Sequence, residues 1–427
     1  MHGSVFAWLV AAGPVHAATD KDGSELQDSD DPPAKPAPQV LGPPVRQLDG
    51  TCLCECECPV DTRFVPLEAG EGEEDAGTYV APGKNFRWTP YASPGASPEL
   101  GALIAAGALF SFSLDPEDPA LPRSSISSAV TFSTTGALLV TVLPTFYLPK
   151  DKVRIMANIY FKDMADNYWG VGFKEGAQTE QGPDTTAYDR LWWQFNPRVV
   201  LQIKPHVFVG PVLDLNQTDA TNLNAKMAQD PYVLADGTNN LNTGAGIIFQ
   251  YDTRDFPQNA FSGLFLEARF TAYESWLRDP HPYLTARLDF RSYTTIGPRP
   301  GSTLAWNVVG YFEFGDTPWS ELPLVGSPYD LRGYYWGRFR DQQATNAVVE
   351  YRYHFPTQRP GREYSRSGVV AWGGLGFVGD NFLEAPLLPN VGVGYRFEVQ
   401  PRMNLRVDFG FGAFDSFGFY INFLEAF

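Results

Sequence analysis

The residues with the widest range of potential chemistry are four cysteines, Cys52, Cys54, Cys56 and Cys58, which alternate with single residues. Cysteine side chains form disulfides, bind metal ions or act as nucleophiles. Zinc sites usually separate paired cysteines by two to four residues, so the tighter spacing here favours disulfides over a metal. Disulfides also require an oxidising compartment, which for this chain would be the periplasm.

No other set of residues resembles a catalytic motif. The sequence contains no Gly-x-Ser-x-Gly elbow, no His-Glu-x-x-His pair and no phosphate-binding loop. The histidines His206, His281 and His354 stand apart from one another, and His354 is expected to line a wet channel rather than to act as a base. We therefore expect no enzymatic step, no cofactor and no metal.

Net charge and hydrophobic runs restrict the class of protein. The 427 residues carry a formal net charge of -17 without a basic cluster, which excludes nucleic acid as a partner because phosphate binding needs concentrated Lys and Arg. Beyond the N-terminus, no run of about eighteen apolar residues occurs. If this chain spans a membrane, it must therefore do so with β-strands.

The first 85 residues differ in composition and pattern from the remainder. Residues 5–12 are apolar, and Val15-His16-Ala17 forms a small-x-small cleavage pattern, so we expect a signal peptide over 1–17. Residues 18–85 are acidic and rich in Pro and Gly, a composition that buries too little apolar surface to fold. We expect this segment, with its four cysteines, to be a disordered periplasmic tail.

From residue 86 to residue 427, segments of about ten residues carry apolar side chains at every second position. In the segment 153–162, one face carries Val, Ile, Ala, Ile and Phe, whereas the other carries Arg, Met, Asn, Tyr and Lys. Such a strand suits a wall between lipid and water. A soluble sandwich would show the same alternation, but short connections such as 149–151 alternate with long ones such as 164–187, as in outer-membrane barrels.

The segments add up to an even number, as single-chain bacterial barrels require. The predicted strands lie near 87–94, 99–114, 123–134, 137–148, 153–163, 188–203, 205–216, 243–254, 261–274, 283–295, 302–315, 344–355, 368–378, 389–399, 402–413 and 416–427. The sequence thus predicts an all-β fold, a 16-stranded antiparallel transmembrane β-barrel over 86–427, with both chain ends in the periplasm.

The last predicted strand resembles the assembly signal of outer-membrane barrels, polar-x-Gly-x-x-apolar-x-apolar. The matching residues are Ser416, Gly418, Ile421 and Phe423, and the sequence closes on the aromatic Phe427. We expect the aromatic row of this strand, Phe427 included, to face lipid. The alternative is an ordinary terminal strand of a soluble sheet, which would expose an aggregation-prone aromatic edge to water.

Two further motifs lie inside the chain. Asp252 and Arg254 share the lumen-facing parity near the end of one strand and can pair, while Asp255, followed by Pro257 and later Gly263, marks a tight turn. Leu331-Arg332-Gly333-Tyr334 lies inside a long predicted loop, 316–343.

Over about 87–427, these motifs resemble, in the same order, those of the BamA/TamA family of outer-membrane assembly factors, also known as bacterial surface antigens. The resemblance implies that the loop 316–343 folds back into the lumen, where an acidic side chain on the wall holds Arg332. Glu350 is the expected partner by parity, and a buried guanidinium without one would cost about 3–5 kcal/mol. The sequence departs from the family pattern at Gly374, where an Asp is expected, and we recognise no POTRA domains.

The first predicted strand contains Pro90 and Pro94, neither of which can donate a ladder hydrogen bond. We therefore expect poor pairing of this strand. Where it meets the last strand, the seam either opens sideways toward lipid, as attributed to assembly factors, or is shortened but permanently closed.

The resemblance implies a role in inserting or translocating proteins or lipids at the bacterial outer membrane. Its expected partners are outer-membrane lipid, nascent outer-membrane proteins or periplasmic chaperones, and the assembly machinery that inserts the barrel itself. Two other functions remain open on the sequence: a passive channel for small solutes, and a surface-exposed structural or adhesive protein.

Overall fold

The computed structural model describes residues 85–97, 100–118, 121–274, 281–297, 301–380, 386–400 and 402–427. The expected signal peptide, the acidic tail and the four cysteines lie outside these residues. Among the described residues, no helix has the length and apolar character needed to cross a bilayer.

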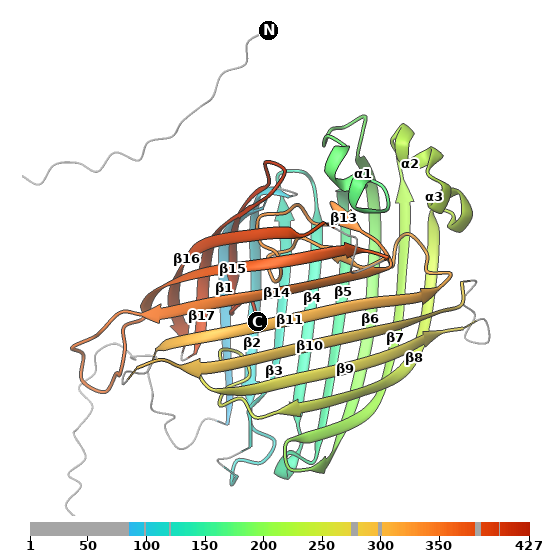
Figure 1. Ribbon diagram of the computed structural model, residues 1–427. Helices are drawn as coiled ribbons and strands as arrows, with labels where there is room; N and C mark the ends of the chain where they lie inside the picture. Colours follow the sequence, from blue (N-terminus) through green and yellow to red (C-terminus); the bar gives the residue numbers. More distant parts are fainter. Residues whose placement is uncertain are drawn as a thin grey trace, which may run out of the picture. The chain divides into compact units, whose positions relative to one another are not determined.

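Sixteen antiparallel strands form one sheet that curls into a nearly closed barrel, and each strand pairs with its neighbours in chain order (Figure 1). The strands are β1 (Phe86–Ser97), β2 (Gly101–Phe112), β3 (Ser124–Ser133), β4 (Leu138–Tyr147), β5 (Val153–Asn167), β6 (Ala187–Lys204), β7 (Val207–Thr221), β8 (Asn239–Asp252), β9 (Gly263–Tyr273), β10 (Tyr283–Thr295), β11 (Ser302–Gly315), β14 (Gln343–His354), β15 (Ser367–Gly379), β16 (Leu388–Gln400), β17 (Met403–Gly412) and β18 (Phe417–Phe423). The predicted fold class and strand number are confirmed.

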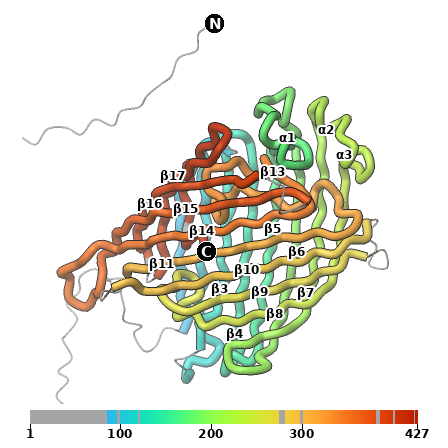
Figure 2. Tube along the Cα trace, in the orientation of Figure 1, coloured from blue at the N-terminus to red at the C-terminus, as the bar shows by residue number. Residues whose placement is uncertain are grey.

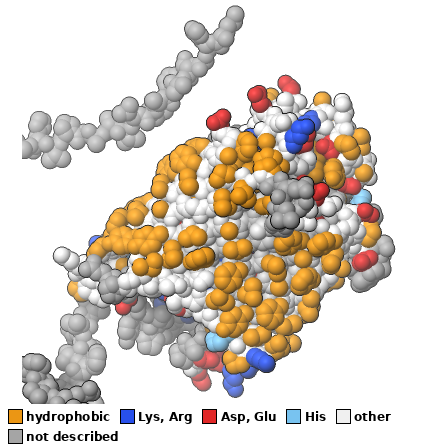
Figure 3. Space-filling view, in the orientation of Figure 1, with side chains coloured by type: hydrophobic (Ala, Val, Ile, Leu, Met, Phe, Trp, Pro, Cys, Tyr) orange, Lys and Arg blue, Asp and Glu red, His pale blue; other side chains and the backbone are white. Residues whose placement is uncertain are grey.

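The predicted alternation of faces is visible in β5. Ile155, Ile159 and Phe161 are each more than a third exposed on the outside, whereas Arg154 is buried inside the barrel. Figure 3 shows hydrophobic side chains over the wall of the barrel and charged side chains mainly at its two ends. The strand period of two therefore separates an apolar outer surface from a polar lumen.

The two ends of the barrel differ. One end, which we call the helical rim, carries α1 (Phe173–Gln178), α2 (Ala225–Gln229) and α3 (Pro231–Asp236) in the loops after β5 and β7. A buried cluster there packs Trp319 against Tyr168, Tyr188 and Met227. The opposite end, which we call the terminal rim, is where β1 begins and β18 ends, and it includes the short 3-10 helix η1 (Pro149–Asp151).

The end of the chain differs from the prediction. β18 ends at Phe423 instead of continuing to Phe427, and Leu424 adopts a φ of 66°. Phe427 is buried in the lumen, so its predicted lipid-facing position is wrong. A continued strand would place Glu425 on the lipid face, where an unpaired carboxylate is costly. The inward turn instead brings Glu425 Oε2 to 2.8 Å from Arg396 Nε.

The seam between β1 and β18 lacks a ladder. Within the described residues, no register joins these two strands, although a Cβ on Gly95 would lie 3.6 Å from the carbonyl oxygen of Ile421. β1 has 12 residues and β18 has 7, so part of β1 faces no strand on this side.

The expected poor pairing of the first strand is wrong for its β2 side, where β1 stays in register from Phe86 to Ser97. Pro90 and Pro94 are four positions apart and therefore share one ladder parity. Because the β1–β2 register continues through both prolines, we infer that their missing donors lie on the free edge, toward β18. The pairing deficit is confined to the seam.

Candidate functional site

The long segment between β11 and β14 passes inside the barrel. It contains a two-stranded sheet, β12 (Leu324–Val325) and β13 (Phe339–Arg340). Leu331, Tyr334 and Phe339 are fully buried in a cluster with apolar side chains of β14, β15 and β16. We call residues 316–342 the lumen loop. Its hydrophobic side chains give the loop a core of its own against one wall of the barrel.

Arg332 anchors this loop to the wall. Its guanidinium donates to Glu350 Oε2 at 2.5 Å and to Asp408 Oδ2 at 2.9 Å, and it lies 3.5 Å from the centroid of the Trp372 ring. The structure thus places Arg332 against Glu350, the partner chosen from parity. The second carboxylate, Asp408, comes from β17.

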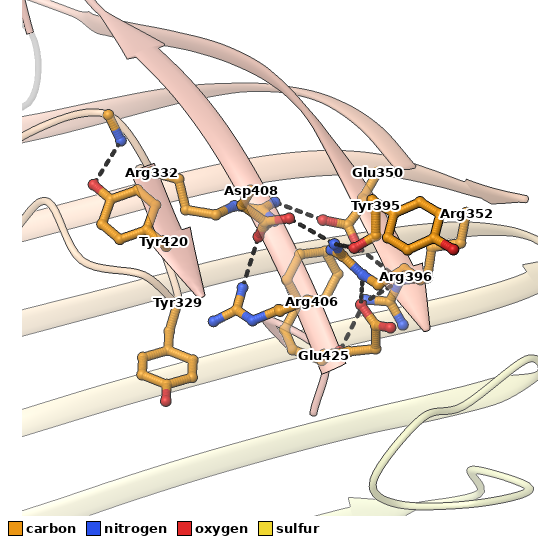
Figure 4. Close-up of polar contacts among 12 residues, drawn as sticks. Tyr329, Arg332, Glu350, Arg352, Tyr395, Arg396, Arg406, Asp408, Tyr420 and Glu425 are labelled. Atoms are coloured by element: carbon orange, nitrogen blue, oxygen red, sulfur yellow. Dashed lines mark hydrogen bonds and ion pairs between the residues drawn. The ribbon is translucent and has the colours of Figure 1, made fainter. Parts of the chain in front are cut away.

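The two carboxylates belong to a larger charged cluster that we call the arginine network (Figure 4). It consists of Arg332, Arg352, Arg396, Arg406, Glu350, Asp408 and Glu425, and each side chain is at most 1% exposed. Arg352 Nε lies 2.7 Å from Glu350, and Arg396 NH1 lies 2.6 Å from Asp408. Four guanidinium groups therefore share three side-chain carboxylates, and removing any one carboxylate would leave still more buried positive charge without an ion-pair partner.

Backbone contacts fix the loop at the same point. Gly333 has a φ of 121° and donates its N–H to the hydroxyl of Tyr420 on β18 at 3.0 Å. The Asn390 side chain donates to the carbonyl of Arg332. A Cβ on Gly410 would clash with this same carbonyl, so only glycine lets β17 approach the loop this closely.

Sequence reasoning missed most of this network. It identified Arg332 and Glu350, but not Asp408, Arg396 or Glu425. Gly374, where the family pattern expects an acid, lies two residues from the Trp372 ring that covers Arg332. The carboxylate that accompanies Glu350 is supplied by β17 instead. The alternating charges of Arg406 and Asp408 were the available signal, because both have lumen parity.

The predicted rim motif lies at the terminal rim. Arg254 Nε donates to Asp252 Oδ1 at 2.9 Å, and Arg154 NH1 also reaches Asp252, at 3.0 Å. Asp255 accepts instead from Arg402, at 2.8 Å, in the turn between β16 and β17. Gly263 has a φ of 103°, and a Cβ there would clash with the carbonyl of Thr253. The motif therefore connects the β8–β9 turn to two other parts of the rim.

The residues of the predicted assembly signal have separate surroundings. Ser416 is buried and accepts a hydrogen bond from Arg338 of the lumen loop at 2.8 Å. Gly418 leaves room for the ring of Tyr420, whose hydroxyl would clash with an added Cβ. Ile421 remains in β18, and Phe423 ends it.

Chemically, the site is suited to holding a loop rather than to transforming a ligand. Each of its three carboxylates pairs with at least one guanidinium group, and within the described ranges no three His, Cys, Asp or Glu side chains gather as metal ligands. The site joins the lumen loop to β14, β17 and β18, so it couples the loop to the strand that borders the seam.

No family model and no curated protein matches this sequence. Among solved structures, BamA from Haemophilus ducreyi lacking POTRA domains 1-3 has a TM-score of 0.53 at 12% identity, over 80% of this chain and 70% of that chain. CdiB from Acinetobacter baumannii has a TM-score of 0.48 at 10% identity, over 80% and 60%. Wzi, an outer-membrane protein involved in group 1 capsule assembly in Escherichia coli, has a TM-score of 0.33 at 10% identity, over 80% and 84%. The similarity to BamA is one of barrel fold.

Proposed function

We propose that this protein is a bacterial outer-membrane barrel that assists the insertion or translocation of proteins or lipids at that membrane. The observation that carries the proposal is the missing ladder between β1 and β18. An unpaired strand edge is a template for another strand, and a seam that no ladder holds can open and so join the lumen to the bilayer. A passive pore with a permanently closed wall would require neither the unpaired strand edge nor the seam.

The lumen loop supports the same function. It is tied to β18 through the hydrogen bond between Gly333 and Tyr420, and the inward-turned Glu425 is held by Arg396. A movement of the lumen loop would therefore displace β18, the strand that borders the seam. In this proposal, the arginine network keeps the loop and the end of the last strand in one position while the seam opens and closes.

Orientation follows the barrel rule that long loops are extracellular. The helical rim would then face the cell exterior, and the terminal rim, with both chain ends, would face the periplasm. The partners would be outer-membrane lipid, nascent outer-membrane proteins or periplasmic chaperones, and the machinery that inserts this barrel.

A disulfide across the seam tests the proposal. Gly95 and Asn422 would be replaced by cysteine in a chain whose four native cysteines are serine, because Gly95 lies beside the backbone of Ile421. The control pair, Ala105→Cys with Thr131→Cys, joins two residues already paired in the intact β2–β3 ladder. Insertion of a small unfolded outer-membrane barrel into proteoliposomes, read as heat-modifiable gel migration, and lipid transfer between leaflets would be measured.

We expect the seam disulfide to abolish both activities, with recovery after reduction, and the control disulfide to change neither. Equal activity of the locked and unlocked barrels would overturn the proposal. A passive channel would instead show steady conductance that rises when the lumen loop is deleted. A structural or adhesive protein would tolerate the locked seam and depend on the loops that carry α1, α2 and α3.

A further inference from the structure

The outer surface of the barrel carries a groove of about 500 Å³ that is centred on β15. Its two walls belong to β14 and β16, the strands that pair with β15, and Phe409 of β17 extends the wall on the β16 side. Figure 2 shows these four strands running side by side. The arginine network lies on the opposite, lumen-facing side of the same part of the sheet.

The groove exists because β15 presents small residues between larger ones. In the strand register, Ala371 on β15 is flanked by Tyr351 on β14 and by Val393 on β16. Two residues further along the same face, Gly373 has no atom within 4 Å of the place where a Cβ would lie. The outer surface is therefore lower along β15 than along the strands on its two sides.

Tyrosine rings border the end of the groove that is nearer the terminal rim. Tyr353 of β14 and Tyr395 of β16 lie on opposite sides of β15. The Tyr395 hydroxyl donates to Ser367 Oγ at 2.8 Å, and the Tyr351 hydroxyl shares a hydrogen bond of 2.9 Å with Ser302. These bonds hold two of the three rings in place. Tyrosine favours the level of a bilayer at which the headgroups begin.

The groove opens toward the bilayer. Several of its side chains are at least 40% exposed on the apolar outer surface, namely Tyr351, Val369, Val393, Tyr395 and Phe409. Figure 3 shows hydrophobic side chains over this part of the wall. In a barrel that spans a membrane, such a surface meets acyl chains. At the usual strand spacing, β14 and β16 lie about 10 Å apart, which leaves room for one acyl chain between their side chains.

The turn at the terminal end of the groove is basic. It connects β14 to β15 over residues 355–366 and contains three arginines and one acidic residue. Arg362 pairs with Glu398 at 2.7 Å, whereas Arg359 is exposed. A lipid whose acyl chain lies in the groove places its headgroup beyond the tyrosine rings, beside this turn. Positive charge at that level favours an anionic headgroup over a zwitterionic one.

We propose that this groove binds one anionic phospholipid, with an acyl chain along β15 between Tyr351 and Val393 and the headgroup beside the turn 355–366. The inference goes beyond the proposed function, because it requires that the barrel lie in a bilayer but not that the seam open. A zwitterionic lipid, or the apolar surface of a second copy of this chain, would each give a different result in the following experiment.

Native mass spectrometry of the full chain in detergent counts bound lipids and protein copies together. The probes are palmitoyl-oleoyl phosphatidylglycerol, the zwitterionic phosphatidylethanolamine with the same chains, and glycerophosphoglycerol, which is the headgroup without chains. We expect the first molecule of phosphatidylglycerol to bind more tightly than the first molecule of phosphatidylethanolamine. Glycerophosphoglycerol, which lacks an acyl chain for the groove, should not bind measurably.

Substitutions at Ala371 test the position of the acyl chain. Ala371→Leu fills the groove and should weaken binding of the first lipid of either kind roughly tenfold, the effect of losing the burial of about two methylene groups. The milder Ala371→Val should have a smaller effect in the same direction. Ala245→Leu is the matched control, on the outer face of β8 two residues from the exposed Ile247, and should bind as the unaltered chain does. Heat-modifiable migration would show that each variant forms the barrel.

Arginine substitutions in the turn test the position of the headgroup. Arg359→Gln with Arg366→Gln should lower the affinity for phosphatidylglycerol to that for phosphatidylethanolamine, and should leave the latter unchanged. Lys150→Gln with Lys204→Gln, an equal change of charge at exposed positions elsewhere on the terminal rim, is the control and should keep the preference. A preference that survives the loss of both arginines would overturn the assignment of the headgroup.

Lipid binding that is unchanged in Ala371→Leu, or equal affinity of the unaltered chain for the two lipids, would overturn the inference. Paired copies of the protein that dissociate in Ala371→Leu would assign the groove to a second copy and also reject a lipid. The seam-locked barrel should bind phosphatidylglycerol as the unlocked barrel does. Activities that depend on the seam, together with lipid binding that ignores Ala371→Leu, would refute this inference and leave the proposed function standing. The reverse pair of results would refute the proposed function alone.

Discussion

At the wall formed by β14 to β18, the four arginines and three carboxylates of the arginine network, which include Arg332 of the lumen loop, are all at most 1% exposed and contact one another. On the wall formed by β5 to β10, Lys162 and Arg198 have no carboxylate partner among the described residues, and Arg287 and Arg291 are partly exposed. Both walls are rich in arginine, yet only the first is closed to water. Buried charges that form ion pairs with one another fix a structure, whereas an accessible charge without an ion-pair partner is available to a ligand.

The largest expected effect comes from making the same substitution on both walls. Asp408→Asn leaves Arg332, Arg396 and Arg406 short of a buried carboxylate and should destabilise the barrel by about 3–5 kcal/mol. Asp289→Asn removes a carboxylate that is itself buried, but its partners Arg287 and Arg291 are partly exposed, so the loss should be smaller, about 1–3 kcal/mol. Urea unfolding followed by gel migration measures both. Equal losses of unfolding free energy in the two variants would show that the two walls do not differ in how they depend on their carboxylates.

A second test addresses the close contact between the lumen loop and β17. Gly410→Val places side-chain atoms against the carbonyl of Arg332 and should cost about 1–3 kcal/mol by overpacking, with release of the loop. Gly373→Val on β15 is the matched control, because a Cβ there meets nothing within 4 Å. Protease cleavage within residues 316–342 should increase only in the first variant. A resistant loop in Gly410→Val would mean that the network holds the loop without this contact.

A smaller effect is expected at the link between the loop and the last strand. Tyr420→Phe removes the acceptor for the N–H of Gly333 and should cost about 1 kcal/mol. Tyr395→Phe, which loses an exposed hydroxyl contact to Ser367, should change stability by less. Loop mobility measured by a spin label on the lumen loop would rise in the first variant alone. Equal loop mobility in the two variants would show that this hydrogen bond does not couple the lumen loop to β18.

The smallest effect concerns Asp236 in α3, a partly buried carboxylate at the helical rim. Burial raises its pKa above the usual value, although Trp319 donates a backbone hydrogen bond to it at 2.8 Å and His281 lies 3.9 Å away. The folded protein thus binds a proton more readily than the unfolded chain, so this contribution to stability is greatest below about pH 4 and is lost as pH rises through the raised pKa.

Asp236→Asn removes this titration. The variant should match the unaltered chain at low pH and become relatively more stable as pH rises toward neutral. Melting temperatures of both proteins across this pH range provide the measurement. A difference that shrinks with rising pH would show that the charged form of Asp236 is the favourable one in the fold.

Local patterns predicted much of the fold. The period of two in β5 identified both its faces, and the even number of such segments predicted the barrel. These properties are local, because side-chain alternation follows from the covalent geometry of an extended chain. The motif around Arg332 likewise indicated an inward loop, and parity selected Glu350 as a residue that could reach it.

What the sequence alone determined is therefore the strand pattern and the parity of each side chain. The tertiary structure decided that Asp408, 76 residues from Arg332, completes its ion pairs, that Glu425 turns inward with Phe427, and that Lys162 and Arg198 have no carboxylate beside them among the described residues. Contacts across a lumen depend on how the sheet closes and on the stagger of strands far apart in the chain. No period along a single strand contains that information.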